Sequence, residues 1–370
     1  MRSGVDAPAL QPIADDDPGW LGFIASQPHA TVFHHPAWSR VIAEAYGFRP
    51  LVLAQSATDG SVEAGLPLLE LRRSRRGPRF ASLPFTDYCP PLVASASPPG
   101  GDGGGLDRLT ASLLAWREAA SVGEVAVHAA LPAVAGVEVA TRAVRHVLDL
   151  DGSAAELEAR MKGTQVLRAI KKARRAGLRA TLGRSHEEAR AFYYLHVLTR
   201  HRQGVPVQPR RFMDLLWKHV IDKQLGFIVL VYLDRQPVAG ALYLAWNRNL
   251  IYKFGASDPR YWELRPNNLA MWTAIEWACE QGYRTLDFGR TDLDNQGLRD
   301  FKSRWGAAEL PLTYSYLGAA AHPSAAVAAR RARLRKLALD AAGRVIRTSP
   351  RIVCRASGAL LYGRLQGFAS

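Results

Sequence analysis

Residues 225–257, LGFIVLVYLDRQPVAGALYLAWNRNLIYKFGAS, decide how this chain folds. They form three runs of apolar, β-branched and aromatic residues, and a DRQP turn separates the first two, which is typical of antiparallel strands. Residues 268–281 follow with the spacing of a helix, and the segment YRTLDFG at 283–289 predicts one more strand. The order strand, strand, strand, helix, strand predicts an α/β unit.

The first half of the chain repeats this order. PLVLAQSA, a TDG turn at Thr58–Gly60 and SVEAGLPLLELRR predict a hairpin, and a strand around Phe80–Leu83, a helix over 106–120 and the strand GEVAVHAA follow. The Ala64–Gly65 and Ala239–Gly240 pairs sit alike on the second hairpin strands. A meander whose last strand is reached through a helix is how the GNAT fold is built. The predicted fold class is therefore α/β, with tandem GNAT-like lobes of mixed, mostly antiparallel sheets flanked by helices.

Length and charge divide the chain further. With 370 residues, 48% of them hydrophobic, it can bury more than one core. Residues 1–150 carry 12 basic and 15 acidic side chains, residues 151–318 carry 26 and 17, and residues 319–370 carry 10 and 1. We expect an N-terminal lobe at 1–150, a C-terminal lobe at 151–318, and a basic amphipathic helical tail at 319–370. Such an asymmetry indicates contact with a polyanion, either nucleic acid or an anionic membrane face.

Cysteine content and the first residues bear on the compartment. Cys89, Cys279 and Cys354 are odd in number and far apart, which favours free thiols and a reducing compartment. The N-terminal segment lacks an apolar core of signal-peptide length, and no uncharged run is long enough to span a bilayer. We therefore expect a cytoplasmic protein.

The strongest local motif is Leu286-Asp287-Phe288-Gly289-Arg290 followed by GLRDFKSRWG at 297–306. The chain here resembles the C-terminal lobe of the Fem family, which shares the pattern D-x-G, then G-L-x-x-F-K-x-x-[FW]-G. The resemblance extends to the RAIKKARRAGL stretch at Arg168–Leu178, and in the first lobe to FHHPAW at Phe33–Trp38 and LPFTDYCPPL at Leu83–Leu92. It implies transfer of an activated acyl or aminoacyl group to a primary amine without a covalent enzyme intermediate.

The same resemblance supplies candidate residues in the second lobe. Such a transfer needs a donor or cation for the developing oxyanion. Lys302, which with Phe301 matches the family's F-K pair, is the first candidate for that duty, and the alternative is a lysine on a solvated helix face. Asp287 is a candidate to orient the amine, although an Asp before Phe-Gly also suits turn geometry. Arg290 suits an anionic substrate group, or a salt bridge to Asp287 or Asp292.

Candidates for the acceptor come from both lobes. Asp87 and Tyr88 lie on a loop that follows a strand, and Asp87 is a candidate to hold or deprotonate the amine, with turn chemistry as the alternative. Other candidates for substrate binding are Phe301, the pair Arg210 and Arg211, which would bind a diphosphate, and either Tyr252 or its neighbour Lys253. His34-His35 lack a second Cys/His pair, so no metal site is expected.

The donor is the least determined part. A CoA-dependent GNAT enzyme starts the helix after its third strand with a glycine-rich turn, but ELRPNNLA at 263–270 contains no glycine, and Asn267 or Asn268 is expected to cap that helix and Asn268 to contact the substrate. This departure favours aminoacyl-tRNA over acyl-CoA, with no tightly bound cofactor. Cationic side chains that a helix would place together predict a tRNA-binding stripe, with a merely solvated face as the alternative; they are Arg168, Lys171, Lys172, Arg174 and Arg175. Fem proteins of the best-known type insert a coiled-coil arm in the second lobe. This chain has no sustained heptads, so we do not expect the arm here.

Three functions remain open from the sequence. The leading hypothesis is a Fem-like transferase that moves an aminoacyl group, from tRNA, to an amine of a cell-envelope precursor. The rivals are an N-acyltransferase that uses acyl-CoA or another acyl donor in envelope polysaccharide or specialised-metabolite synthesis, and an inactive scaffold at the membrane. The tail at 319–370 could rest on an anionic membrane surface, pack on the lobes or bind tRNA.

Overall fold

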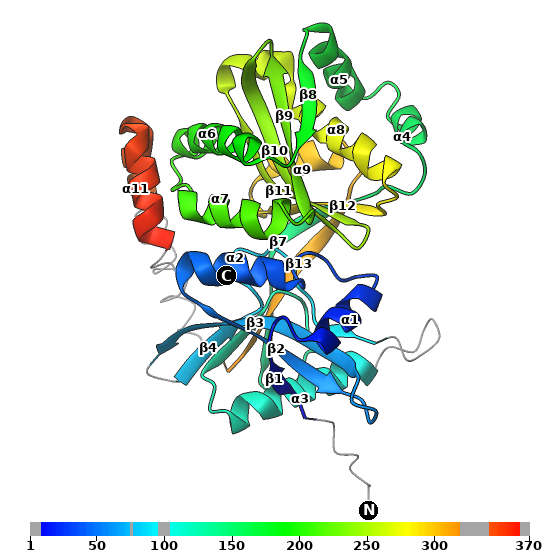
Figure 1. Ribbon diagram of the computed structural model, residues 1–370, viewed down its shortest axis with the longest axis vertical. Coiled ribbons are helices and arrows are strands. Elements are labelled where there is room, and N and C mark those ends of the chain that lie inside the picture. Colours follow the sequence, from blue (N-terminus) through cyan, green and yellow to red (C-terminus); the bar gives the residue numbers. More distant parts are fainter. Residues whose placement is uncertain (1–8, 75–76, 95–103, 319–339, 363–370) are drawn as a thin grey trace, which may run out of the picture. The chain divides into compact units, whose positions relative to one another are not determined.

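A computed structural model describes residues 9–74, 77–94, 104–318 and 340–362 (Figure 1). These residues form two compact units, one from the chain up to Val144 with 311–318, and one from 145–310 with 340–362. The sequence placed the first border after residue 150 and assigned 311–318 to the second lobe. Both borders fall inside strands, β7 (Val137–Asp149) and β13 (Ala308–Leu317), so no change in composition marks them.

Unit 1 is a mixed sheet with helices. In β2, β3 and β4 each strand is antiparallel to the next, and α3 then leads to β6, which runs parallel to β4. The core between this sheet and α3 contains Leu53, Leu66, Leu109 and Leu113, all fully or almost fully buried. The elements are β1 (Gln11–Ile13), α1 (Pro18–Ser26), α2 (Pro36–Tyr46), β2 (Arg49–Ser56), β3 (Val62–Ser74), β4 (Gly77–Ala81), β5 (Leu92–Val93), α3 (Gly105–Ala119) and β6 (Glu124–Val127).

Unit 2 repeats that plan. Strands β8 to β11 are antiparallel in sequence order, and α8 leads to β12, which runs parallel to β11. The elements are α4 (Ala154–Arg160), α5 (Gln165–Arg175), β8 (Arg179–Gly183), α6 (His186–Gln203), α7 (Arg210–Leu216), β9 (Gly226–Leu233), β10 (Gln236–Trp246), β11 (Asn249–Ser257), the 3₁₀ segment η3 (Pro259–Leu264), α8 (Pro266–Glu280), β12 (Thr285–Thr291), α9 (Gln296–Ser303) and α11 (Arg351–Tyr362). A π-helical turn at Trp217–Ile221 extends α7.

The two faces of the unit 2 sheet carry different helices. Because side chains alternate along a strand, Val229 and Val231 join the core under α8 and α5, whereas Gly240 lies on the other face beside Phe192 of α6. A Cβ at Gly240 would stand 2.9 Å from Leu230 Cδ2 and 3.1 Å from the Phe192 ring, so glycine allows α6 to pack closely. Gly65 does the same in unit 1, where a Cβ would stand 3.0 Å from the ring of Trp20 in α1. The matched glycines and strand orders show two GNAT-like units.

Local sequence signals set several helix ends of unit 2. Gly163, which adopts a positive φ, lies between α4 and α5, and Ser185 with Glu188 forms a capping box on α6. The expected asparagine cap of α8 is wrong. Arg265 is the N-cap at φ +63°, its side chain makes no capping bond, and Pro266 occupies the first helical position. Proline has no backbone N–H, so at that position there is no donor for a side-chain cap to bind.

The described part of the tail is helical, as expected, at 340–348 and in α11; residues 319–339, with Arg331 and Arg335, lie outside the described residues. Cys354 and Ile346 are buried against Val197 and Val207 of unit 2. Among the described residues no helix is both long and apolar enough to cross a bilayer.

Candidate functional site

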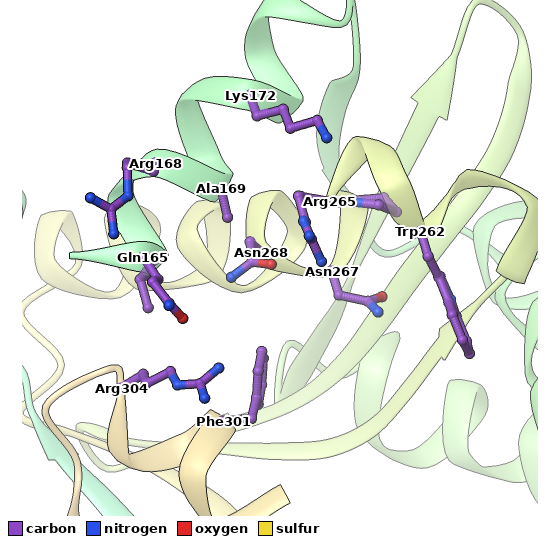
Figure 2. A pocket seen from close by; sticks show the side chains of 12 residues that line it. Gln165, Arg168, Ala169, Lys172, Trp262, Arg265, Asn267, Asn268, Phe301 and Arg304 are labelled. Carbon is purple, nitrogen blue, oxygen red and sulfur yellow. The ribbon is translucent and has the colours of Figure 1, made fainter. Parts of the chain in front are cut away.

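A pocket of about 570 Å³ opens at the N-terminal end of α8 in unit 2 (Figure 2). Side chains of α5 border it on one side, Phe301 and Arg304 of the α9 segment face it from another, and Asn267 and Asn268 lie between them. Four of its lining side chains are cationic and none of the described lining residues is acidic. The lining residues are Gln165, Val166, Arg168, Ala169, Lys172, Trp262, Arg265, Pro266, Asn267, Asn268, Phe301 and Arg304.

Helix α5 points its cations at this pocket because its other face is anchored. Val166 and Ile170 are buried in the core beside α8, which leaves Arg168 and Lys172 on the open side. Lys172 Nζ lies 4.0 Å from a carboxylate oxygen of Glu263, and both side chains are more than half exposed, so this pair hardly offsets the cation. The pocket therefore keeps a positive potential.

The helix end adds to that potential. The N-terminal end of a helix carries a partial positive charge and free amide groups, which favours an anion. In α8, however, Pro266 has no N–H, so one of the backbone donors for an anion is missing. The side chains of Arg265 and Arg304 line the pocket and can donate hydrogen bonds in its place. Sequence reasoning missed both arginines. Arg304 follows Phe301 by three residues, a helical spacing that could have revealed it.

Lys302 does not line this pocket. It follows Phe301 on α9, and consecutive side chains of a helix point about 100° apart, so Phe301 faces the pocket while Lys302 turns toward β12. Its side chain is 3% exposed, and Nζ donates hydrogen bonds to the carbonyl oxygens of Gly289 (2.7 Å) and Arg290 (3.2 Å). The ammonium thus holds the C-terminal part of β12, where the positive φ of Gly289 makes a turn inside the strand.

Asp287 and Arg290 shape the same turn. One Asp287 oxygen accepts a hydrogen bond from the Gly289 amide (2.7 Å), and the other pairs with Arg145 of β7 at 2.9 Å. Arg290 pairs with Asp292 at 3.0 Å, which is one of the two salt bridges that the sequence offered. Gly289 has φ +70°, a backbone conformation that explains the glycine of the D-x-G motif.

A buried histidine that the sequence did not single out adjoins Lys302. His146 of β7 has a fully buried side chain, and its Nε2 lies 3.2 Å from a Glu309 carboxylate oxygen. Burial, and next the charge of Lys302, lower the pKa of His146 below its usual value. Arg299 of α9 binds the same carboxylate at 2.7 Å. No local pattern reveals this cluster, because its members come from strands and a helix far apart in sequence.

Other predicted residues of unit 2 lie outside this pocket. Arg174 pairs with Glu276 of α8 at 3.0 Å, whereas Lys171 and Arg175 are exposed. Arg210 lies 3.6 Å from Asp214, and Arg211 is exposed. Tyr252 packs against Tyr243 and the core, and burial raises its pKa to about 12.

Asp87 and Tyr88 belong to unit 1. The backbone oxygen of Asp87 accepts a hydrogen bond from the Tyr314 hydroxyl (2.9 Å), and Tyr88 packs at the edge of the unit 1 core. His34 is buried and bonds with the Pro90 carbonyl oxygen, and burial lowers its pKa to about 4. His35 caps α2. Both histidines therefore have structural partners.

Residues 160–303 match the family described as acetyltransferase (GNAT) domain. This segment is similar to that family. It contains the α8 pocket, apart from Arg304, and all of the turn held by Lys302.

Known proteins extend the comparison. A lipid II:glycine glycyltransferase of Staphylococcus aureus is 35% identical over 75 residues, which are 19% of this chain and 18% of that protein. The chain thus spans less than a fifth of the length of this curated relative. FemX superposes with a TM-score of 0.64 over 83% of this chain and 97% of its own, at 15% identity. L-PGS from Bacillus licheniformis gives 0.52 over 90% and 97%, at 13% identity. Alongside the GNAT domain, these matches confirm the predicted resemblance to the Fem family and the tandem GNAT-like α/β fold.

Proposed function

We propose that this protein is an aminoacyltransferase that moves an activated aminoacyl group to a primary amine of a cell-envelope precursor, and that the α8 pocket binds the anionic end of the donor. The observation that carries the proposal is the convergence of Arg168, Lys172, Arg265 and Arg304 on one pocket without an acidic lining residue. Arginine forks bind phosphate oxygens in pairs, which suits a phosphodiester or a diphosphate.

The donor that we infer is aminoacyl-tRNA. Acyl-CoA binding in a GNAT domain relies on backbone amides at this helix end, and here Pro266 removes one amide while a non-glycine residue, Arg265, takes the positive φ. Cations on side chains can instead follow the spaced phosphates of a nucleic-acid strand. The similarity to the lipid II:glycine glycyltransferase of Staphylococcus aureus supports an aminoacyl group and a lipid-linked acceptor.

The reaction joins the acceptor nitrogen to the aminoacyl carbonyl carbon. The amine attacks neutral, the ester C–O bond breaks, the ribose hydroxyl leaves, and the proton lost by nitrogen ends on that hydroxyl. We assign Lys302 a positioning role, because its ammonium fixes the 289–290 carbonyls of the turn beside Asp287. Asp87 and Tyr88 of unit 1, and Asn268, Tyr252, Arg290, Arg210 and Arg211 of unit 2, stay candidates for contacts with the substrates. A lipid-linked acceptor would bring the protein to the cytoplasmic face of a membrane.

Helix α5 offers a matched experiment on the donor. The double variant Arg168→Gln/Lys172→Gln removes two pocket cations, and Lys171→Gln/Arg175→Gln removes two exposed cations of the same helix outside the pocket. Purified protein is incubated with charged tRNA or acyl-CoA pools, and mass spectrometry identifies the donor that is consumed. We expect the protein to consume charged tRNA. The rate of consumption should fall about tenfold or more in Arg168→Gln/Lys172→Gln, and less in Lys171→Gln/Arg175→Gln.

Three results would count against this proposal. If only acyl-CoA is consumed, the donor is not aminoacyl-tRNA and the protein is a GNAT N-acyltransferase. Equal losses in the two double variants would assign RNA binding to the whole stripe instead of the pocket. No turnover with any donor would favour a scaffold.

A further inference from the structure

A second hollow of unit 2, about 290 Å³ in volume, lies where α11 meets α6 and the start of α7. Its walls include four arginines and two tyrosines: Arg190, Tyr193, Tyr194, Arg210, Arg351 and Arg355. Figure 1 shows α11 beside the ends of α6 and α7. This hollow shares no residue with the α8 pocket.

Helix α11 is firmly seated there. Cys354 is fully buried, the His201 ring bonds with the Ser349 carbonyl oxygen at 2.7 Å, and Arg347 donates to the Gln203 carbonyl oxygen at 3.3 Å. Gly358 lies against the Val207 backbone, where a Cβ would collide with the carbonyl oxygen. The hollow is therefore built by specific packing between elements distant in sequence.

The arginines of the hollow differ in how far other groups already engage them. Arg210 is shared with Asp214, and the charge of Arg351 acts on the carboxylate of Asp258, which Arg260 binds directly. Arg190 and Arg355 take part in no ion pair among the described residues. The Tyr193 hydroxyl donates to the Gln208 carbonyl oxygen at 3.1 Å and interacts with Arg355. The N-terminal end of the 12-residue α11, which begins at Arg351, adds its positive dipole end. None of the described residues that line the hollow is acidic, whereas four are arginines, so the hollow is suited to receive an anion.

Exposed apolar side chains surround the cations. Ile352 of α11 is 70% exposed, Tyr194 of α6 is 53% exposed, and Val345 just before α11 is 58% exposed. A water-soluble phosphate gains nothing from an exposed isoleucine. A bilayer offers both a layer of phosphates and, beneath it, an apolar interior, so cations and apolar tips on one surface match its interface.

We propose that the hollow between α6 and α11 is a docking site for the phosphate of an anionic membrane lipid, with Ile352 and Tyr194 entering the interface beside it. Arg190, Arg351 and Arg355 bind the headgroup oxygens. The site shares no described lining residue with the α8 pocket, and it rests on the proposed function only in that a lipid-linked acceptor requires the enzyme at a membrane.

The test uses the full chain and flotation with two kinds of vesicle, phosphatidylcholine alone and phosphatidylcholine mixed with phosphatidylglycerol. We expect the protein to bind the anionic vesicles and not the neutral ones. Arg351→Gln/Arg355→Gln should weaken binding about 30-fold, as expected for two cations at a lipid surface. Arg235→Gln/Arg284→Gln removes two exposed cations elsewhere in unit 2 and is the matched control, with a small loss. Ile352→Ser should also weaken binding while conserving every charge.

Equal losses in the two arginine doubles would mean nonspecific attraction by net charge and would overturn the site. Displacement from vesicles by inorganic phosphate at the concentration of lipid phosphate would assign the hollow to a free phosphate, and unchanged binding of Ile352→Ser would remove the apolar half of the proposal. The vesicles contain neither donor nor acceptor. Failure of the transfer function therefore leaves this result unaffected, and turnover of a water-soluble amine can persist when vesicle binding is lost.

Discussion

Lys302 directs its ammonium inward, toward two backbone carbonyl oxygens at the end of β12. A buried cation in that position fixes the path of the chain between Asp287 and Asp292, including the positive-φ residue Gly289. The match to the F-K pair of the Fem family pointed to this residue, and the sequence expected it to meet substrate charge. The geometry instead favours an indirect contribution through the turn.

Replacement of Lys302 by Met keeps the length of the side chain and removes the hydrogen bonds. A buried carbonyl oxygen, of Gly289, and a partly buried one, of Arg290, would then lose a donor, which should lower the free energy of unfolding by about 1–3 kcal/mol. Turnover should fall at least tenfold with a small change in the donor KM, because positioning errors act on the transition state. Denaturant titration and steady-state kinetics measure both. Lys218→Met, at an exposed lysine, is the control; turnover that survives in Lys302→Met would remove the turn from the mechanism.

Site residues could be predicted where their neighbours are local in the chain, and not where their partners are remote. Phe301 and Lys302 were found because a contiguous motif carries them, and Arg168 and Lys172 because helical spacing places them together. Arg145 and His146 could not be found, since their partners Asp287 and Glu309 lie more than a hundred residues away. Strand alternation is local information, whereas strand order across a sheet is not.

At the scale of elements, the repeated strand order was predictable because apolar runs and turn residues mark each hairpin. The start of α8 was misjudged for a local reason. Asparagines are favoured caps, but Arg265 adopts a positive φ and Pro266 opens the helix without a side-chain cap. The borders of the two units were not visible either, because each lies within a continuous strand.

Gly358 allows α11 to pack closely against the Val207 backbone, and its replacement should destabilise that helix. Gly358→Ala places a methyl group against the Val207 carbonyl oxygen, so α11 must shift, and we expect a loss of about 1–3 kcal/mol in its local stability. Hydrogen exchange should rise in 343–358 and stay unchanged in β9 to β12. The matched variant is Gly22→Ala in α1, where a Cβ meets no atom within 4 Å; it should be neutral or stabilising by up to about 1 kcal/mol. Slow exchange of α11 in Gly358→Ala would contradict the packing.

At the scale of the whole molecule, the +15 charge is distributed unevenly, and its basic excess lies beyond residue 150. The α8 pocket and the α6–α11 hollow both belong to that part and concentrate arginines at separate places. If one anionic partner bound a single basic surface, the arginines would not be expected to gather at two separate sites. The division is consistent with two anionic partners, a donor and a lipid, whose binding can be separated by mutation.

Each unit also contains a buried neutral histidine, which links its folding to pH. Burial lowers the pKa of His34 in unit 1 and of His196 in unit 2 to about 4 from the ordinary histidine value of 6.5. Between these values the unfolded chain binds a proton that the folded chain does not, so stability is complete above pH 6.5 and falls as pH drops toward 4. The expected loss is about 3 kcal/mol for each histidine over that range.

Denaturant titrations from pH 7 to 4 measure this dependence. His196 stacks on Phe192 and bonds with Gln208 at 2.8 Å, so His196→Gln should cost stability at neutral pH yet flatten the slope below pH 6.5, and His34→Gln should do the same in unit 1. His29→Gln, at an exposed histidine, should retain the full slope. If the slopes of His196→Gln and His34→Gln match that of the unaltered protein, carboxylates and not these buried rings control acid unfolding, because only the histidine contribution differs among the variants.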